Sequence, residues 1–120
     1  MNDKVTTINE LKKLVTTFIT ERDWNKFHSP KNMVQALALE VSELSELFLW
    51  DDCEQSKKTV EKKRSDIEDE IADVVFWALE FCAQCNIDLS SAMKRKMVQN
   101  IKKYPTEKCK GKAIKYTELE

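Results

Sequence analysis

Two pairs of acidic residues occur inside hydrophobic patterns typical of helices. Glu40 and Glu43 lie three residues apart, and Glu70 and Asp73 repeat this spacing later in the chain. A helix turns by about 100° per residue, which directs Glu40 into an apolar stripe and places the other carboxylates at the edges of such stripes. A carboxylate that faces a core is costly unless it is paired or binds a metal. If the two helices pack face to face, four carboxylates converge and need a cation.

The residue types indicate which cation this would be. All-oxygen ligands suit a hard divalent ion, which makes Mg²⁺ the first expectation and Mn²⁺ a substitute. We therefore predict that Glu40, Glu43, Glu70 and Asp73 bind the metal and form the catalytic centre. A carboxylate-bound Mg²⁺ beside lysines fits the cleavage of a phosphoanhydride by water.

The elements that position these residues are expected to be helices. The chain has one Gly and two Pro in 120 residues, which favours long helices with short connections. Ser29 and Pro30 form a typical helix start, and Asp88 is a good cap for a later helix. The apolar stripes predict an all-α bundle of four to five helices, with segments at 5–22, 30–50, about 57–84 and about 89–104. Residues 1–120 are expected to form a single domain, with about 106–120 as a C-terminal arm.

Aromatic residues flank the first acidic pair. The connection before residue 30 contains Trp24, Phe27 and His28, the only histidine. These residues could form a flat pocket for a nucleobase. The loop alone favours the alternative, in which Trp24 and Phe27 plug the end of the bundle and His28 lies at the surface. Trp50 either covers a site beside the carboxylates or fills the core.

The last long helix carries polar groups where packing would favour apolar ones. Lys96, Asn100 and Lys103 fall on or beside the stripe that ends at Tyr104. One lysine could extend to solvent, but three polar groups along the stripe indicate a lined pocket. Two ammonium groups near a metal site suit a polyphosphate.

Composition excludes several classes of function. The net charge of −1 provides no basic field for nucleic acid. No apolar run of about 18 residues predicts a membrane span, and the N-terminus lacks the apolar core of a signal peptide. A cytoplasmic location is therefore the expectation. Cys82 and Cys85 form a Cys-x-x-Cys, but its helical setting favours small, reduced core residues over a zinc site.

The acidic pairs also carry a family resemblance. Glu40-Val-Ser-Glu43 and Glu70-Ile-Ala-Asp73 resemble the Glu-x-x-Glu and Glu-x-x-Asp signature of the all-α nucleoside triphosphate pyrophosphohydrolases, the MazG-like superfamily. The chain is most similar to the dCTP pyrophosphatase branch, and the resemblance covers nearly everything after about residue 18. The further similar blocks are the segment from Arg22 to Pro30, the extension from Leu44 to Trp50, Asn100-Ile-Lys-Lys-Tyr104-Pro105, and Lys115-Tyr-Thr-Glu-Leu119.

This resemblance implies a specific reaction. The expected chemistry is Mg²⁺-dependent hydrolysis of dCTP, or a modified dCTP, to the monophosphate and pyrophosphate, which clears surplus or non-standard nucleotides. Glu40, Glu43, Glu70 and Asp73 match the metal ligands of the family. The substrate-binding positions carried over are Trp24, His28, Trp50, Trp77, Lys96, Asn100, Lys103 and Tyr104. Trp77 departs from the Tyr that the branch often has. The resemblance also implies a homodimer or homotetramer that assembles through its helices.

Other functions remain open at this point. The same reaction could act on other nucleotides such as dUTP. A non-catalytic helical module would place the acidic pairs at subunit seams, and no divalent ion would stabilise it. A di-iron bundle usually supplies Glu-x-x-His pairs, whereas His28 lies outside both acidic motifs.

Overall fold

The computed structural model describes residues 1–120 and contains helices and no β-strand. The chain divides into two compact units, Met1–Ile87 and Asp88–Glu120. The first unit contains α1 (Ile8–Glu21), the 3₁₀ turn η1 (Asn25–Phe27), α2 (Pro30–Glu46), α3 (Cys53–Lys62) and α4 (Arg64–Gln84). The second unit contains α5 (Leu89–Lys103), α6 (Thr106–Cys109) and the 3₁₀ turn η2 (Tyr116–Glu118). The predicted all-α fold is confirmed.

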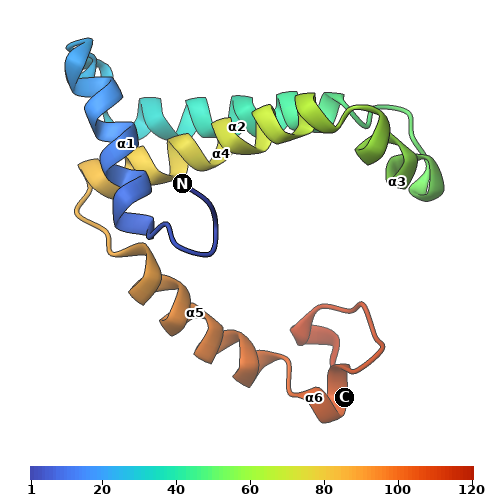
Figure 1. Ribbon diagram of the computed structural model, residues 1–120. Helices are drawn as coiled ribbons and strands as arrows, with labels where there is room; N and C mark the ends of the chain where they lie inside the picture. Colours follow the sequence, from blue (N-terminus) through green and yellow to red (C-terminus); the bar gives the residue numbers. More distant parts are fainter. The chain divides into compact units, whose positions relative to one another are not determined.

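Two long helices form the frame of the first unit. Helices α2 and α4 lie side by side and antiparallel, and they make the most extensive contact between elements (Figure 1). Helix α1 packs against α4 at one end of this pair, and α3 contacts α4 near the other end. The facing surfaces of α2 and α4 are therefore fixed along most of their length.

The helix starts follow from local capping groups. The Ser29 side chain accepts a hydrogen bond from the Asn32 amide and Pro30 occupies the first turn of α2, as predicted. Asp88 caps α5 in the same way, and this prediction is also confirmed. Thr7 forms a reciprocal capping box at α1, which starts that helix at residue 8 rather than 5.

The predicted helix over about 57–84 is wrong, because the structure has two helices there. Asp52 and Gln55 form a capping box that starts α3 at Cys53, and this signal was not recognised in the sequence. Lys63 leaves the helical conformation, with φ −116° and ψ 29°, and separates α3 from α4. The predicted helix over 30–50 is too long, since α2 ends at Glu46 and turns follow up to Trp50.

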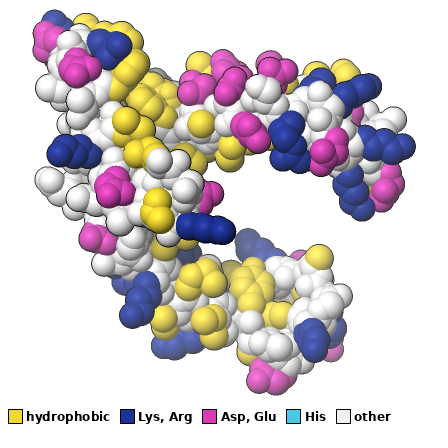
Figure 2. Space-filling model, viewed as in Figure 1, with side chains coloured by type: hydrophobic (Ala, Val, Ile, Leu, Met, Phe, Trp, Pro, Cys, Tyr) yellow, Lys and Arg dark blue, Asp and Glu magenta, His cyan; other side chains and the backbone are white.

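The buried core is small. Its apolar members are Val15, Ile19, Met33, Leu79 and Cys82. Cys82 and Cys85 are free thiols, with Cys82 buried and Cys85 half-buried, as expected for reduced core residues. Many large apolar side chains remain exposed, and Figure 2 shows a patch of them where α1 lies against the α2–α4 pair. Those on α1 and α4 are Ile8, Leu14, Phe18, Ile71 and Val75.

The second unit folds its tail back onto the end of α5. The Tyr116 amide donates a hydrogen bond to the Tyr104 hydroxyl at 3.2 Å, and the two rings meet edge to face. The Lys103 ammonium lies 4.7 Å from the centre of the Tyr116 ring. These contacts give residues 106–120, the predicted C-terminal arm, a defined conformation. No helix in the chain combines the length and apolar character that a membrane span requires.

Candidate metal centre and active site

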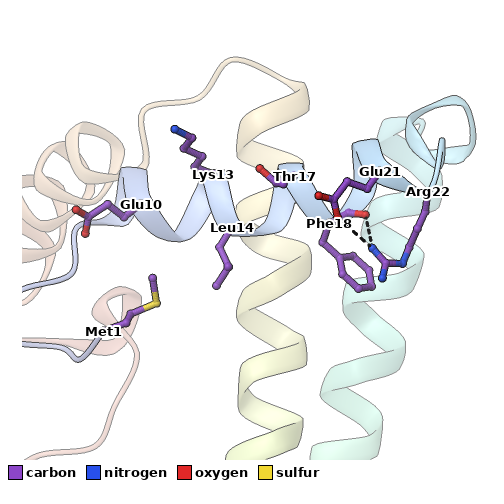
Figure 3. A pocket seen from close by; sticks show the side chains of 8 residues that line it. All are labelled: Met1, Glu10, Lys13, Leu14, Thr17, Phe18, Glu21 and Arg22. Carbon is purple, nitrogen blue, oxygen red and sulfur yellow. Dashed lines mark hydrogen bonds and ion pairs between the residues drawn. The ribbon is translucent and has the colours of Figure 1, made fainter.

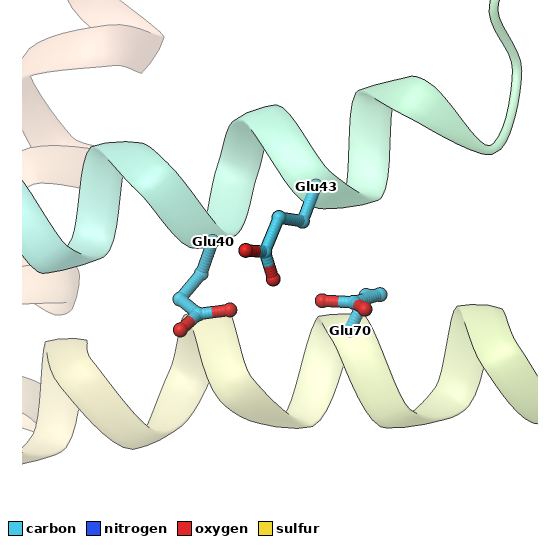
Figure 4. A group of neighbouring side chains, drawn as sticks. All are labelled: Glu40, Glu43 and Glu70. Atoms are coloured by element: carbon cyan, nitrogen blue, oxygen red, sulfur yellow. The ribbon is translucent and has the colours of Figure 1, made fainter.

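Three of the four predicted metal ligands converge between α2 and α4. Glu40 and Glu43 project from α2 and Glu70 projects from α4 toward them (Figure 4). One carboxylate oxygen from each residue lies within 4.8 Å of the other two. The three-residue spacing on α2 puts both glutamates on the face that α4 covers, and the antiparallel pairing brings Glu70 opposite them.

Two oxygens of this cluster lack a partner. Glu40 Oε2 and Glu70 Oε2 are the only buried side-chain oxygen or nitrogen atoms in the chain without a hydrogen bond. None of the ion pairs in the protein involves Glu40, Glu43 or Glu70. Buried acceptors without donors are costly, so the cluster fits a cation that would bind these oxygens.

Burial and mutual repulsion change the titration of the cluster. Burial raises the pKa of Glu40 above its ordinary value of 4.5, and the neighbouring carboxylates of Glu43, Asp73 and Glu70 raise it further. Burial also raises the pKa of Glu70, again with contributions from Glu43 and Asp73. The cluster therefore favours either bound protons or a bound cation over full ionisation without either.

Asp73 lies near this cluster but outside its closest group. Its charge contributes to the raised pKa of both Glu40 and Glu70, but it is not among the three residues with oxygens within 4.8 Å. Its side chain is exposed and lines a groove with Val15 and Phe76. Its role as a fourth ligand stays a prediction.

The loop before α2 differs from the interpretation that the loop alone favoured. Phe27 is 58% exposed, so it does not plug the bundle, and Trp24 is partly exposed with its ring edge against Phe18. His28 is not at the surface, because its side chain is only 8% exposed. Its ring lies 5.1 Å from the ring of Trp77, which brings together two of the predicted substrate-binding residues.

Trp50 does not fill the core. It is 91% exposed, and its backbone has a φ of +70°. A bulky residue rarely adopts this left-handed conformation, which costs about 1–3 kcal/mol and occurs mainly at functional sites. An indole exposed in this way has both faces free for a ligand.

The predicted phosphate-side residues lie in the second unit. Lys96, Asn100 and Lys103 are on α5, and Tyr104 follows its last turn. Asn100 is half-buried, whereas the two lysines are exposed. Their roles in binding the substrate stay predictions.

Glu80 is a buried charged residue that the sequence reasoning missed. It is 0% exposed and lies on α4, where its carboxylate pairs with His28. The signal was present, because Glu80 interrupts an apolar run and follows Asp73 by seven residues, which places both on one helix face.

A separate groove of about 490 Å³ runs along α1 and contains no comparable cluster of carboxylates. Figure 3 shows Leu14 and Phe18 on one side of α1, with Lys13 and Thr17 on the other. The remaining lining residues are Met1, Glu10, Glu21 and Arg22. Arg22 donates a hydrogen bond to the Phe18 carbonyl, and none of the three clustered glutamates lines the groove.

Comparison with known proteins matches both the fold and the acidic motifs. Residues 35–119, which include both motifs, match the model of the MazG-like family. The chain belongs to the MazG-like family. It is 38% identical to rat dCTP pyrophosphatase 1 over 115 residues, which cover 94% of this chain and 68% of that protein. Human dCTP pyrophosphatase 1 is 36% identical over the same extent.

A solved structure supports the same assignment. This MazG-like chain superposes on the crystal structure of a pyrophosphatase from Archaeoglobus fulgidus DSM 4304 with a TM-score of 0.80 and 34% identity. The match covers 88% of this chain and 98% of the archaeal protein. The family and the fold expected from the acidic motifs are thereby confirmed.

We predict that Glu40→Gln stabilises the metal-free protein and that the gain grows with pH. Because the folded-state pKa is raised, the native protein keeps a proton that the unfolded chain releases above about pH 4.5, so this group lowers stability as the pH rises through that window. Below pH 4.5 both states are protonated and the variant gains nothing. Near pH 7 we expect the variant to have a higher Tm than the unaltered protein, and the difference should grow as the pH rises from about 5 to 7.

The measurement is thermal unfolding in a chelator between pH 4 and 8. Glu46→Gln is the matched control, because Glu46 is exposed on the same helix. A Tm difference that stays constant with pH, or a variant that is less stable at neutral pH, would contradict the prediction.

Proposed function

We propose that this MazG-like protein is a divalent-metal-dependent nucleotide pyrophosphohydrolase that converts dCTP and water to dCMP and pyrophosphate. The observation that carries this proposal is the cluster of Glu40, Glu43 and Glu70, with its two unpartnered buried oxygens. The 38% sequence identity to rat dCTP pyrophosphatase 1, which extends over 94% of the chain, supports the proposed reaction and substrate. Removal of surplus or modified deoxycytidine nucleotides is the cellular role that follows.

The carboxylates would bind Mg²⁺, with Mn²⁺ as a substitute. Glu40, Glu43 and Glu70 offer three converging oxygens, and Asp73, whose charge raises the pKa of Glu40, would be the fourth ligand. When bound, the cation neutralises the phosphate oxygens of the substrate. The carboxylates would hold the cation between α2 and α4, and one of them would accept the proton of the attacking water.

The aromatic residues would bind the base. Trp50 presents an exposed indole for stacking. Trp77 lies one turn beyond Asp73 on α4, and the ring of His28 contacts it. Trp24 contributes a further partly exposed indole. Lys96, Asn100, Lys103 and Tyr104 would hold the phosphates and the sugar, since ammonium and amide groups donate to phosphate oxygens.

We also propose that the protein assembles as a homodimer or homotetramer through its helices. A chain of 120 residues can bury a sizeable core, yet only five apolar residues are buried here. Figure 2 shows apolar side chains gathered where α1 lies against the α2–α4 pair, and the exposed Leu14 and Phe18 line a groove with Val15 and Phe76. A contiguous apolar surface of this kind is typical of an interface between subunits.

The direct test is hydrolysis of a panel of nucleotides. Purified protein with Mg²⁺ would be incubated with each deoxynucleoside and ribonucleoside triphosphate and with 5-methyl-dCTP, and pyrophosphate and orthophosphate would be measured separately. We expect pyrophosphate release led by the deoxycytidine nucleotides. Release led by dUTP would overturn the assignment of the base, and no release with Mg²⁺ or Mn²⁺ would overturn the reaction itself.

Glu43→Gln should abolish this hydrolysis while the helical circular dichroism is retained. We expect a loss of at least about 100-fold in kcat, because the variant removes one negative charge from the carboxylates that would bind the cation, and the cation would stabilise the charge of the reacting phosphate. Glu46→Gln, one turn further along α2 and exposed, is the control. Turnover close to that of the control would remove Glu43 from the site.

Trp50→Gly should weaken nucleotide binding without destabilising the fold. Removing a buried Trp typically costs about 3–5 kcal/mol, but Trp50 is exposed and glycine accepts its positive φ without strain. We expect the free energy of unfolding to change by less than about 1 kcal/mol and the Kd for a non-hydrolysable dCTP analogue to rise about 10-fold, since stacking contributes about 1–3 kcal/mol. The affinity of the variant for Mg²⁺ should be unchanged. If the variant binds the dCTP analogue as tightly as the unaltered protein does, Trp50 has no role in binding the nucleotide.

Light scattering after size-exclusion chromatography should give two or four times the chain mass of 14.0 kDa. Leu14→Lys should shift the protein toward the monomer, because it places a charge in the apolar patch. Thr17→Lys is the matched control, since Thr17 projects from the other side of α1 (Figure 3). A monomeric mass for the unaltered protein at micromolar concentration would refute the assembly.

A further inference from the structure

A second buried acidic group lies outside the metal centre. Glu80 is 0% exposed, and its Oε2 lies 3.1 Å from Nδ1 of His28, whose side chain is 8% exposed. A buried carboxylate is costly unless hydrogen-bond donors satisfy it. The proposed cleavage of the phosphoanhydride does not use the Glu80–His28 pair, so this pair has a different role.

Glu80 is fully satisfied by donors from two segments. Gln84 Nε2 donates to Glu80 Oε1 at 2.9 Å and also to Asn25 Oδ1 at 2.9 Å. Together with the contact of His28 to Oε2, these bonds tie the segment from Asn25 to His28 onto α4. The ring of His28 is further held against the ring of Trp77. The contact of Nδ1 with Glu80 and the packing against Trp77 therefore hold the imidazole ring in one orientation.

This arrangement determines which ring nitrogen carries the hydrogen. When Glu80 is a carboxylate, both of its oxygens can only accept hydrogen bonds, and Nδ1 of His28 is then the donor. In the neutral imidazole, Nε2 then carries a lone pair and no hydrogen. Nε2 has no hydrogen-bond partner and is not among the completely buried atoms that lack one, so this atom keeps some contact with solvent although the side chain as a whole is 8% exposed. His28 presents an acceptor outward.

His28 contacts α4 beyond the acidic motif of that helix. Glu80 and Asp73 share a face of α4, and their seven-residue spacing corresponds to about 10 Å along the helix. That offset is comparable to the length of a nucleoside measured from its phosphate. Trp77 lies between the two acidic residues on the same face, one turn beyond Asp73, and contacts His28.

We propose that Glu80 is a positioning residue that fixes the tautomer of His28, so that Nε2 accepts a hydrogen bond from the exocyclic amino group of the substrate base. This inference rests on the proposed function and deepens its choice of substrate. Cytosine presents a 4-amino donor, whereas uracil and thymine present a 4-carbonyl oxygen. An acceptor at Nε2 attracts the first group and repels the second, so one buried carboxylate discriminates between the two pyrimidine classes.

The tautomer can be measured without any enzyme activity. His28 is the only histidine, so protein labelled with ¹⁵N-histidine gives the signals of a single ring. At an alkaline pH at which the ring is neutral, we expect its single hydrogen on Nδ1. A hydrogen on Nε2 would overturn the proposal whatever the protein hydrolyses.

Glu80→Gln tests the consequence for selectivity. The amide keeps the shape of the carboxylate, but it can present either its oxygen or its amino group to Nδ1 and so releases the constraint on the tautomer. We expect kcat/KM for dCTP to fall about 10-fold, mainly through KM, because one hydrogen bond of about 1 kcal/mol or more is lost. The value for dUTP should stay the same or rise.

The controls separate positioning from a general loss of structure. Glu54→Gln changes an exposed glutamate of α3 that pairs only with Lys57 and should leave both substrates unaffected. Equal losses for dCTP and dUTP in Glu80→Gln, with normal circular dichroism, would overturn the proposal. If the unaltered protein hydrolyses no nucleotide, the proposed function fails, while the ¹⁵N measurement still decides whether Glu80 sets the tautomer.

Discussion

Repulsion among carboxylates held at close range is the constraint on which the rest of the first unit depends. Three glutamates have carboxylate oxygens within 4.8 Å of one another, and their charges repel. The extensive packing of α2 against α4 holds these side chains close together. The stability of the helix pair thus opposes the ionisation of its own centre. A divalent cation resolves this conflict, and the same conflict gives the site its affinity for one.

The buried carboxylate of Glu80, also on α4, is stabilised in the opposite way. Glu80 has donors on both oxygens, whereas Glu40 and Glu70 each keep one oxygen without any. The chain therefore uses one helix for two kinds of carboxylate, one satisfied by protein groups and one left for an external ligand. The satisfied group ties the loop before α2 to α4, and the unsatisfied groups are the ones to which the proposed function assigns the cation.

The parts of this picture that the sequence predicted are those with a local signal. The spacing of Glu40 and Glu43, the Ser29–Pro30 start and the Asp88 cap depend on neighbours within one turn, and they were all found in the structure. The break at Lys63 was missed because charged residues continue through it without Gly or Pro. The Glu80–His28 pair joins residues 52 positions apart, and no local pattern reports such a contact. Trp50 needed its backbone angle and exposure to decide between core and surface.

The small number of apolar side chains that a single chain buries affects how much active protein a cell would contain. When association buries the apolar surface that one chain leaves open, the folded population depends on the total concentration of chains. Dilution then favours unfolded monomers, which proteases remove. Under such coupling the active fraction falls faster than the amount synthesised, so a modest change in expression is amplified into a larger change in the capacity to clear nucleotides.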